Sequence, residues 1–171
     1  MNFGKICLTF YLAKALLVLL KIRKLLLAKT RSCWKNQYSI IDSASNFHNL
    51  FRNIFANDPF FKNFNCYQEV LLSDLVTGYP NNYDAVDWLI DEFSLVLELH
   101  GKQHYIATKF SNNTSYYNIK KNFNNIKYRD NRKKLFLERN NYKYLEIPYT
   151  LQSKINSEYL KELIFKEIYE H

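Results

Sequence analysis

Hydrophobic and polar positions follow two different periods along the chain after residue 42. Apolar residues recur at helical spacing in three segments that we predict as helices, at residues 43–57, 119–139 and 156–169, the last capped by Asn156. Shorter apolar runs are predicted as strands at residues 66–72, 87–90, 95–100 and 142–147. The predicted order α-β-β-β-α-β-α is typical of an α/β sandwich.

Residues 1–41 form a leucine-rich, basic segment that differs from the rest of the chain. They hold eight Lys and Arg and no acidic residue, whereas residues 42–171 hold 16 basic and 16 acidic residues, so the net charge of +8 belongs to this segment. Lys14 interrupts the apolar run, and Lys14, Lys21 and Lys24 recur at helical spacing. We therefore predict a basic, hydrophobic N-terminal helix in an extension, residues 1–41, followed by one domain, residues 42–171.

Several roles remain open for this N-terminal helix. It is a targeting or signal-like segment, an interfacial membrane helix, an arm that docks on nucleic acid or a protein partner, or a helix packed on its own domain. Membrane or protein contact would use the nearly continuous apolar stretch of residues 6–28. The sequence does not choose between these roles.

The three cysteines exclude two classes of small protein. Cys7, Cys33 and Cys66 are odd in number and lack a Cys-x-x-Cys spacing, which argues against a disulfide framework and a cysteine-ligated zinc. Unpaired thiols are typical of a reducing compartment. The bias toward Asn, Lys, Tyr, Phe and Ile is common in AT-rich genomes. We expect an intracellular protein, with the host cytoplasm of a phage or virus, or a mitochondrion, as the leading locations.

Two acidic residues are predicted to face each other across a hairpin. If the chain turns tightly around residues 92–93, the numbers of paired residues add up to 185, and Asp87 lies opposite Glu98 with Cβ atoms about 5 Å apart. Like charges in this position destabilise a sheet unless a cation neutralises them, and carboxylate oxygens suit Mg²⁺ or Mn²⁺. The alternative is a solvated hairpin face with incidental acids.

A polar cluster follows the second acid on the same strand. His100 shares a sheet face with Glu98 by alternation, and Gly101 permits a change of direction that brings Gln103 and His104 back toward the acids. A histidine placed there could activate water or protonate a leaving group near neutral pH. A lone histidine is otherwise more often structural.

The predicted helix at residues 119–139 carries one inward acid and many basic residues. Asp130 lies near the centre of an apolar stripe, where a carboxylate is costly unless it is paired or metal-bound. The alternative is simple pairing of Asp130 with Lys134 one turn later. The basic residues predict a phosphate-contacting surface formed by Lys120, Lys121, Lys127, Arg129, Arg132, Lys133 and Lys134.

These motifs together resemble the PD-(D/E)XK nuclease superfamily. The resemblance runs from Tyr67 to Tyr149, and its most specific part is Glu98-Leu-His-Gly-Lys-Gln-His104-Tyr105 between Asp87 and Tyr128-Arg-Asp130. Within the superfamily the match is to the branch of very-short-patch-repair (EDxHD) and phage or intron homing endonucleases. The resemblance implies a restriction-endonuclease-like αβββαβ core, with a mixed sheet flanked by helices.

The resemblance also implies roles for individual residues. Asp87 and Glu98 would be metal ligands, His104 the general acid and base, Gln103 a polar partner, and Asp130 the acid that orients water or His104. His100 occupies the place of the superfamily lysine. The branch carries a glutamate on its first helix, but residues 43–57 contain none, and Asn46 or His48 is nearest to its place, with Glu69 on the following strand.

Two functions follow from these features. The first is a metal-dependent endonuclease, using Mg²⁺ or Mn²⁺, that hydrolyses phosphodiester bonds in DNA rather than RNA, in homing or repair. The alternative is an inactive, nuclease-derived protein that binds nucleic acid, such as a component of an organelle ribosome or nucleoprotein. The absent helix glutamate and the basic extension favour the alternative, whereas Asp87, Glu98, His104 and Asp130 favour the enzyme.

Overall fold

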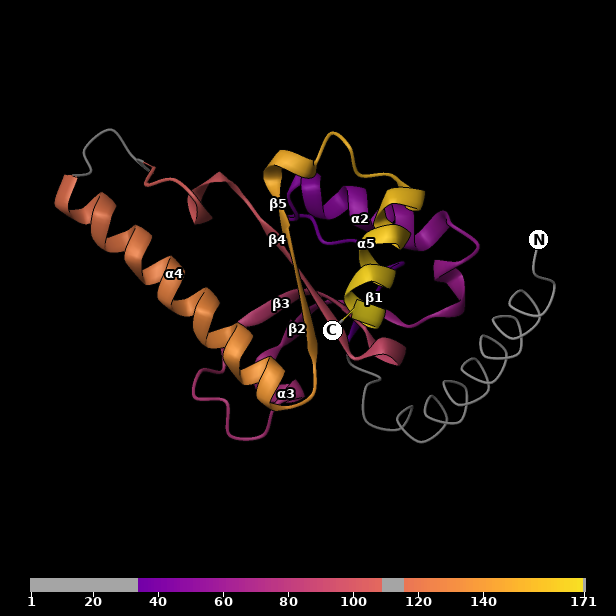
Figure 1. Cartoon of the computed structure of the whole chain (residues 1–171), viewed down its shortest axis with the longest axis horizontal. Helices are drawn as coiled ribbons and strands as arrows, with labels where there is room; N and C mark the ends of the chain where they lie inside the picture. Colours follow the sequence, from indigo (N-terminus) through magenta and orange to yellow (C-terminus); the bar gives the residue numbers. More distant parts are fainter. Residues whose placement is uncertain (1–33, 109–115, 171) are drawn as a thin grey trace. The chain divides into compact units, whose positions relative to one another are not determined.

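A five-stranded mixed sheet forms the centre of the computed structural model, which describes residues 34–108 and 116–170 (Figure 1). The strands lie in the order of the sequence, β1 (Lys35–Asn36), β2 (Cys66–Leu71), β3 (Ala85–Ile90), β4 (Leu95–His100) and β5 (Lys143–Pro148). Neighbouring strands from β1 to β4 pair antiparallel, and β4 pairs with β5 in parallel. The predicted α/β class is therefore confirmed.

Helices cover the sheet on two sides. α4 (Tyr116–Arg139) runs along one side, and α2 (Asn46–Asn57) and α5 (Ser157–Glu170) lie together on the other (Figure 1). One helical turn, α3 (Leu72–Leu75), follows β2. Four short 3₁₀ turns complete the described elements, η1 (Phe61–Asn63), η2 (Asp91–Phe93), η3 (Lys102–His104) and η4 (Tyr149–Leu151).

Aromatic side chains fix α2 against the sheet. Ser45 caps the helix by accepting a hydrogen bond from the His48 amide, and the helical spacing then turns Phe51 and Phe55 inward. The fully buried Trp88 of β3 meets Phe55 edge to face and stacks on the His48 ring at 4.8 Å between centroids. Such aromatic pairs add about 0.5–1.5 kcal/mol each beyond burial, so the His48 ring is held firmly over the sheet.

The β3–β4 hairpin has the predicted register. Trp88 pairs with Leu97 and Ile90 with Leu95, so the numbers of the paired residues add up to 185. The turn is η2, and Ser94 closes it in the left-handed region with φ 47°. Continued by one more position, this register places Asp87 across from Glu98, and Asp87 Oδ2 accepts a hydrogen bond from the Leu99 amide at 2.6 Å.

The parallel pairing of β4 and β5 requires a crossover, which α4 supplies. The helix is fixed to the sheet by the fully buried Leu137 and by Arg132, whose guanidinium donates to Asp84 at 2.8 Å. Tyr79 also donates to Asp84, and both bonds lower the pKa of this carboxyl against the raising effect of burial. β4, α4 and β5 therefore form one unit around a common face of the sheet.

The start of the domain lies within the segment that the sequence assigned to the extension. Residues 1–33, which include the apolar stretch 6–28, lie outside the described residues. β1 pairs with β2 through Lys35 and Gln68, and the compact unit begins at Lys35. None of the helices within residues 34–108 and 116–170 combines the length and apolar character needed to span a membrane.

Replacement of Asp58 by Asn is expected to remove a contribution to folding stability that is present at neutral pH and lost in acid, at the place where α2 meets α5. Burial opposes the charge of Asp58, but hydrogen bonds from Ser157, Lys161 and the Phe60 amide outweigh it and lower the pKa from 3.8 to about 2. A lowered pKa stabilises the fold above the unfolded value, and this contribution is lost as the pH falls from about 4 to 2.

Urea unfolding at a series of pH values measures this effect. The wild type should exceed Asp58→Asn in unfolding free energy at pH 5 and above, and the difference should shrink toward pH 2. The matched control is Asp42→Asn, at an exposed position. A difference that stays constant across this range would contradict the assignment.

Candidate active site

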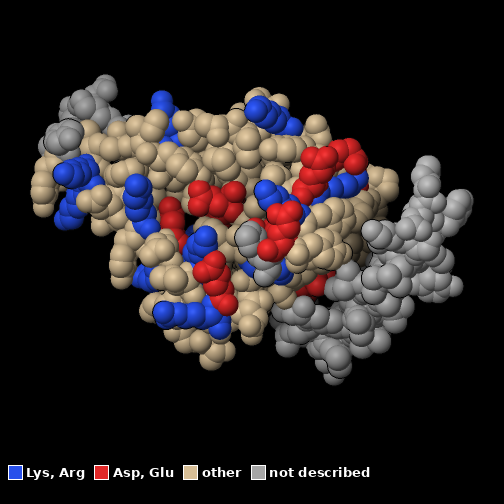
Figure 2. Space-filling view, viewed as in Figure 1, with Lys and Arg blue, Asp and Glu red and all other residues tan. Residues whose placement is uncertain are grey.

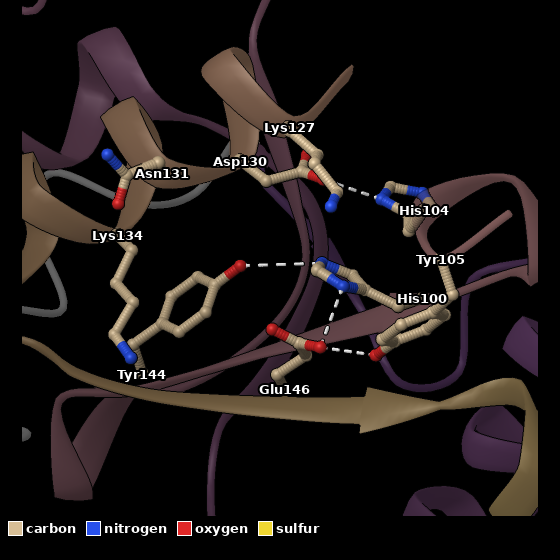
Figure 3. A pocket seen from close by; sticks show the side chains of 9 residues that line it. All are labelled: His100, His104, Tyr105, Lys127, Asp130, Asn131, Lys134, Tyr144 and Glu146. Atoms are coloured by element: carbon tan, nitrogen blue, oxygen red, sulfur yellow. Dashed lines mark hydrogen bonds and ion pairs between the residues drawn. The ribbon is translucent and has the colours of Figure 1, made fainter. Parts of the chain in front are cut away.

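An open pocket of about 430 Å³ lies on the α4 side of the sheet (Figure 3). Its walls come from the end of β4, from η3, from the middle of α4 and from β5. The lining residues are His100, His104, Tyr105, Lys127, Asp130, Asn131, Lys134, Tyr144 and Glu146. Three of them, His100, His104 and Asp130, were predicted as catalytic residues and two, Lys127 and Lys134, as phosphate-contacting residues; the β4–α4–β5 unit brings them together.

His104 and Asp130 form a hydrogen-bonded dyad at the pocket wall. His104 Nδ1 lies 2.7 Å from Asp130 Oδ2, and both side chains are largely buried, at 14% and 15% exposure (Figure 3). The prediction that Asp130 points inward toward His104 is confirmed, and Lys134 instead lies 3.8 Å from Glu138. Burial tends to raise the pKa of Asp130, but the contact with His104 outweighs it and lowers that pKa.

A charged Asp130 can hold His104 in one orientation. When the Asp130 carboxylate accepts a hydrogen bond from His104 Nδ1–H, the lone pair of Nε2 lies on the opposite side of the ring. A group that accepts a proton at Nε2 and returns it later is suited to general acid and base chemistry. The dyad therefore has the arrangement that proton transfer in the pocket requires.

His100 lies behind His104, deeper in the structure. The two rings stack with centroids 4.2 Å apart, and His100 is only 4% exposed. Its Nδ1 is 3.2 Å from Glu146 Oε1, and the Tyr144 hydroxyl approaches its Nε2 at 3.5 Å (Figure 3). Burial and the neighbouring His104 lower the pKa of His100, so this ring supports the dyad as a neutral group.

The two predicted metal ligands lie on adjacent strands, Asp87 on β3 and Glu98 on β4. Glu98 is buried, and its Oε1 accepts a hydrogen bond from Lys133 Nζ at 2.9 Å. Burial raises the pKa of Glu98 to about 8; the charge of Asp87 adds to the rise and Lys133 opposes it. Lys133 Nζ also donates to the Ala85 carbonyl at 2.6 Å. A positive charge therefore already lies where the two acids were expected to need one.

This position of Lys133 corrects one part of the predicted phosphate-contacting surface. Lys133 is 8% exposed, because helical spacing places it inward between Asp130 and Leu137, and it is not available to a phosphate. Arg132 is half-buried and paired with Asp84. The remaining members are exposed and spaced along α4, where Figure 2 shows a row of basic side chains; they are Lys120, Lys121, Lys127, Arg129 and Lys134.

Gln103, like Asp87 and Glu98, is a predicted catalytic residue that does not line the pocket. Its side-chain amide folds back over Gly101, so that a Cβ on Gly101 would lie 2.5 Å from the Gln103 oxygen.

Sequence reasoning did not find the contribution of β5. Glu146 pairs with Glu98 across the parallel strands, and Tyr144 lies two residues earlier on the same face. Tyr105 donates a hydrogen bond to Glu146, which closes this side of the pocket. The alternation of polar residues along residues 142–147 was the available signal, but only the parallel register shows which face they share.

Two groups among the described residues have side chains placed to hold a metal ion. One combines His100, His104 and Asp130, and the other combines His48, Glu69 and Asp87; in each group the ligand atoms lie within 4.8 Å of one another. Asp87 thus belongs to a cluster that reaches from β3 to α2. No protein-family model matches the chain, and no curated protein shows significant similarity to it.

Proposed function

We propose that this protein is a metal-dependent endonuclease that hydrolyses phosphodiester bonds in DNA, on a restriction-endonuclease-like fold. The element order α2-β2-β3-β4-α4-β5 supports this proposal, because it is the αβββαβ order implied by the resemblance to PD-(D/E)XK nucleases. The sheet supports it further, since three antiparallel strands are followed by a parallel one with helices on both faces.

The observation that carries the proposal is the dyad of His104 and Asp130 at the wall of an open pocket. The two residues are 26 positions apart in sequence, and both were predicted from motif positions. In the proposed reaction His104 Nε2 takes a proton from the attacking water and later gives one to the leaving oxygen. Asp130 holds the ring and stabilises the positive charge that His104 then carries.

The donor set around Asp87 and Glu98 fits a hard divalent cation. The Glu98 carboxylate and the Ala85 carbonyl both accept a hydrogen bond from Lys133, which marks a position that favours positive charge, and Asp87 lies across from Glu98 on the neighbouring strand. Mg²⁺ or Mn²⁺ held by Asp87 and Glu98 would supply neutralisation of phosphate charge and a lowered pKa for water. Lys127 and Lys134, on the pocket wall, would bind the phosphates on either side of the scissile one.

One observation favours the alternative of an inactive, nuclease-derived binding protein. Lys133 already neutralises the buried Glu98, so the acids do not need a metal ion for the fold to be stable. The exposed basic residues of α4 would still bind nucleic acid in such a protein. Contacts made by residues 6–28 with a membrane or a protein partner would be compatible with either function.

Incubation of the full chain with supercoiled plasmid separates these two functions. We expect relaxed or linear DNA to accumulate with Mg²⁺ or Mn²⁺ and not with EDTA. We also expect the rate of DNA cleavage to exceed the rate of cleavage of an RNA of the same length. A gel-shift measurement in EDTA controls for binding. Binding without cleavage of DNA or RNA under both metals would leave the inactive binding protein as the function.

A further inference from the structure

His48, Glu69 and Asp87, here called the His48 cluster, come from three elements and meet beside the sheet. His48 lies on α2, Glu69 on β2 and Asp87 on β3, and their ligand atoms all lie within 4.8 Å of one another. His48 is 3% exposed, whereas the Glu69 side chain is 43% exposed. The cluster therefore has a fixed, buried imidazole and an opening to solvent.

Glu69 has an unusual backbone conformation within β2. It has φ 52°, in the left-handed region that residues other than glycine seldom adopt. Gln68 pairs with Trp88 and Val70 with Val86, so the β2–β3 register is the same on both sides of Glu69 and places it opposite Asp87. The Glu69 carboxylate thereby comes to lie 3.7 Å from His48 Nδ1.

The hydrogen bonds of Gln68 determine which nitrogen of His48 carries the proton. Gln68 Nε2 donates to the carbonyls of Asn36 and Ser39 at 2.5 and 2.8 Å, which uses both of its hydrogens. Rotating the amide by 180° would turn its oxygen toward two carbonyl oxygens. Gln68 Oε1 must therefore face His48 Nε2, at 3.0 Å, and accept a hydrogen bond from Nε2–H.

The ring nitrogen that remains to face the cluster is therefore Nδ1. Nδ1 lies 3.7 Å from Glu69 Oε1, which is too far for a hydrogen bond, and the ligand atoms of His48, Glu69 and Asp87 all lie within 4.8 Å of one another. Three electron-pair donors thus converge around one position. A ligating histidine whose other ring nitrogen donates to a fixed acceptor is the usual arrangement at protein metal sites.

We propose that the His48 cluster binds a divalent transition-metal ion of the Mn²⁺ or Zn²⁺ type through His48 Nδ1, Glu69 and Asp87. An imidazole nitrogen with two carboxylates favours these ions over Mg²⁺ and Ca²⁺, which prefer oxygen ligands alone. The inference rests on the proposed nuclease function only through Asp87, which the two sites share. It adds His48 and Glu69 to the metal chemistry of that site.

The other histidine group is less suited to an ion. His104 Nδ1 is already bonded to Asp130 at 2.7 Å, and His100 Nδ1 lies 3.2 Å from Glu146. A metal ion at Nδ1 of either ring would have to displace these short contacts, whereas His48 Nδ1 is separated from Glu69 by 3.7 Å.

Calorimetric titration of the full chain with Mn²⁺ tests the proposal. Glu69→Gln should weaken Mn²⁺ binding by at least about tenfold, because it removes a ligand at an exposed position without disturbing the core. The matched control is Glu162→Gln, an exposed acid on α5. His48→Gln should have the same effect, with near-UV circular dichroism used to check that this buried variant is folded.

Long-range ¹H–¹⁵N spectra of the four histidines give a second, site-resolved measurement. Zn²⁺ should shift the Nδ1 signal of His48 before the signals of the other three histidines. If Zn²⁺ instead shifts His100 and His104 first, or Glu69→Gln binds Mn²⁺ as tightly as the wild type, the proposal is wrong.

The outcomes also distinguish this inference from the nuclease function. If metal binding depends on Glu69 but the protein cleaves neither DNA nor RNA, the metal site at the His48 cluster is supported and the proposed nuclease activity is contradicted. Cleavage that needs Asp87 and Glu98 but is unchanged in Glu69→Gln and His48→Gln, with unchanged Mn²⁺ affinity, would support the enzyme and overturn the His48 cluster.

Discussion

Replacing Asp87 by Asn is expected to reduce Mg²⁺-dependent plasmid cleavage by at least about 10²-fold, as is typical when a group that stabilises transition-state charge is removed. Asn keeps an oxygen that can accept the hydrogen bond from the Leu99 amide, so the end of the β3–β4 ladder should be preserved. What is lost is one negative charge next to both Glu98 and Glu69.

The initial rate of conversion of supercoiled plasmid measures this loss. Asp42→Asn, at an exposed position, is the matched control and should cleave like the wild type. Binding of DNA in EDTA should persist in both variants, because the exposed basic residues of α4 remain. Cleavage by Asp87→Asn within a few fold of the wild type would show that Asp87 holds no catalytic ion.

The same variant should be slightly more stable than the wild type in the absence of metal. Asp87 raises the pKa of Glu98 and, after burial, that of Glu69, which shows that its charge is unfavourable to both neighbours. Removing a like charge from a sheet relieves repulsion of about 0.2–1 kcal/mol. A site that is less stable with its acids than without them is typical of selection for function.

Replacing His104 by Ala is expected to slow cleavage by about 10²–10⁴-fold, the usual contribution of a general acid or base. Asp130→Asn should also slow cleavage, because a neutral amide cannot stabilise a positive charge on the His104 ring. Since the two residues act as a unit at 2.7 Å, the double variant should be hardly slower than His104→Ala alone. Mn²⁺ affinity should be nearly unchanged in all three.

Glu138→Gln, on the exposed side of α4, is the matched control for Asp130→Asn. The pH profiles of cleavage by the wild type and by His104→Ala should also be compared. The variant should lose the inflection due to the catalytic base, which would not happen if His104 had only a structural role. If the fold reduction in rate of the double variant equals the product of the two single reductions, His104 and Asp130 act independently and the dyad does not have its proposed role.

Local patterns in the sequence predicted the parts of the site that depend on periodicity. The alternation of residues 87–100 was enough to fix the hairpin register, and the position of Asp130 in an apolar helical stripe was enough to turn it inward. Lys133 lies three residues after Asp130 and on the same stripe. Its burial could have been inferred, but a dense run of basic residues suggested an exposed surface instead.

The His48 cluster could not be derived in the same way. Glu69 belongs to a predicted strand, but its place opposite Asp87 depends on the β2–β3 register, and its carboxylate lies 3.7 Å from His48 Nδ1 with the backbone in the left-handed region. No residue type near Glu69 signals this conformation, since glycine is absent there. The packing of Trp88 on the His48 ring, which places His48 of α2 beside β3, likewise depends on tertiary structure.

The carbonyls that hold Gln68 belong to Asn36 and Ser39, so the hydrogen-bond partner of the deeply buried His48 ring is held in place by the first residues of the domain. Thermodynamic reciprocity then requires that a cation bound by His48 stabilise residues 36–39, and that anything ordering residues 36–39 tighten cation binding by the same factor. Hydrogen exchange of the Ser39 amide, which donates to Asn36 at 3.0 Å, would report this coupling from outside the cluster. A shortened chain beginning at residue 42 would lose both carbonyls and release Gln68, and with it the preference of His48 for one tautomer.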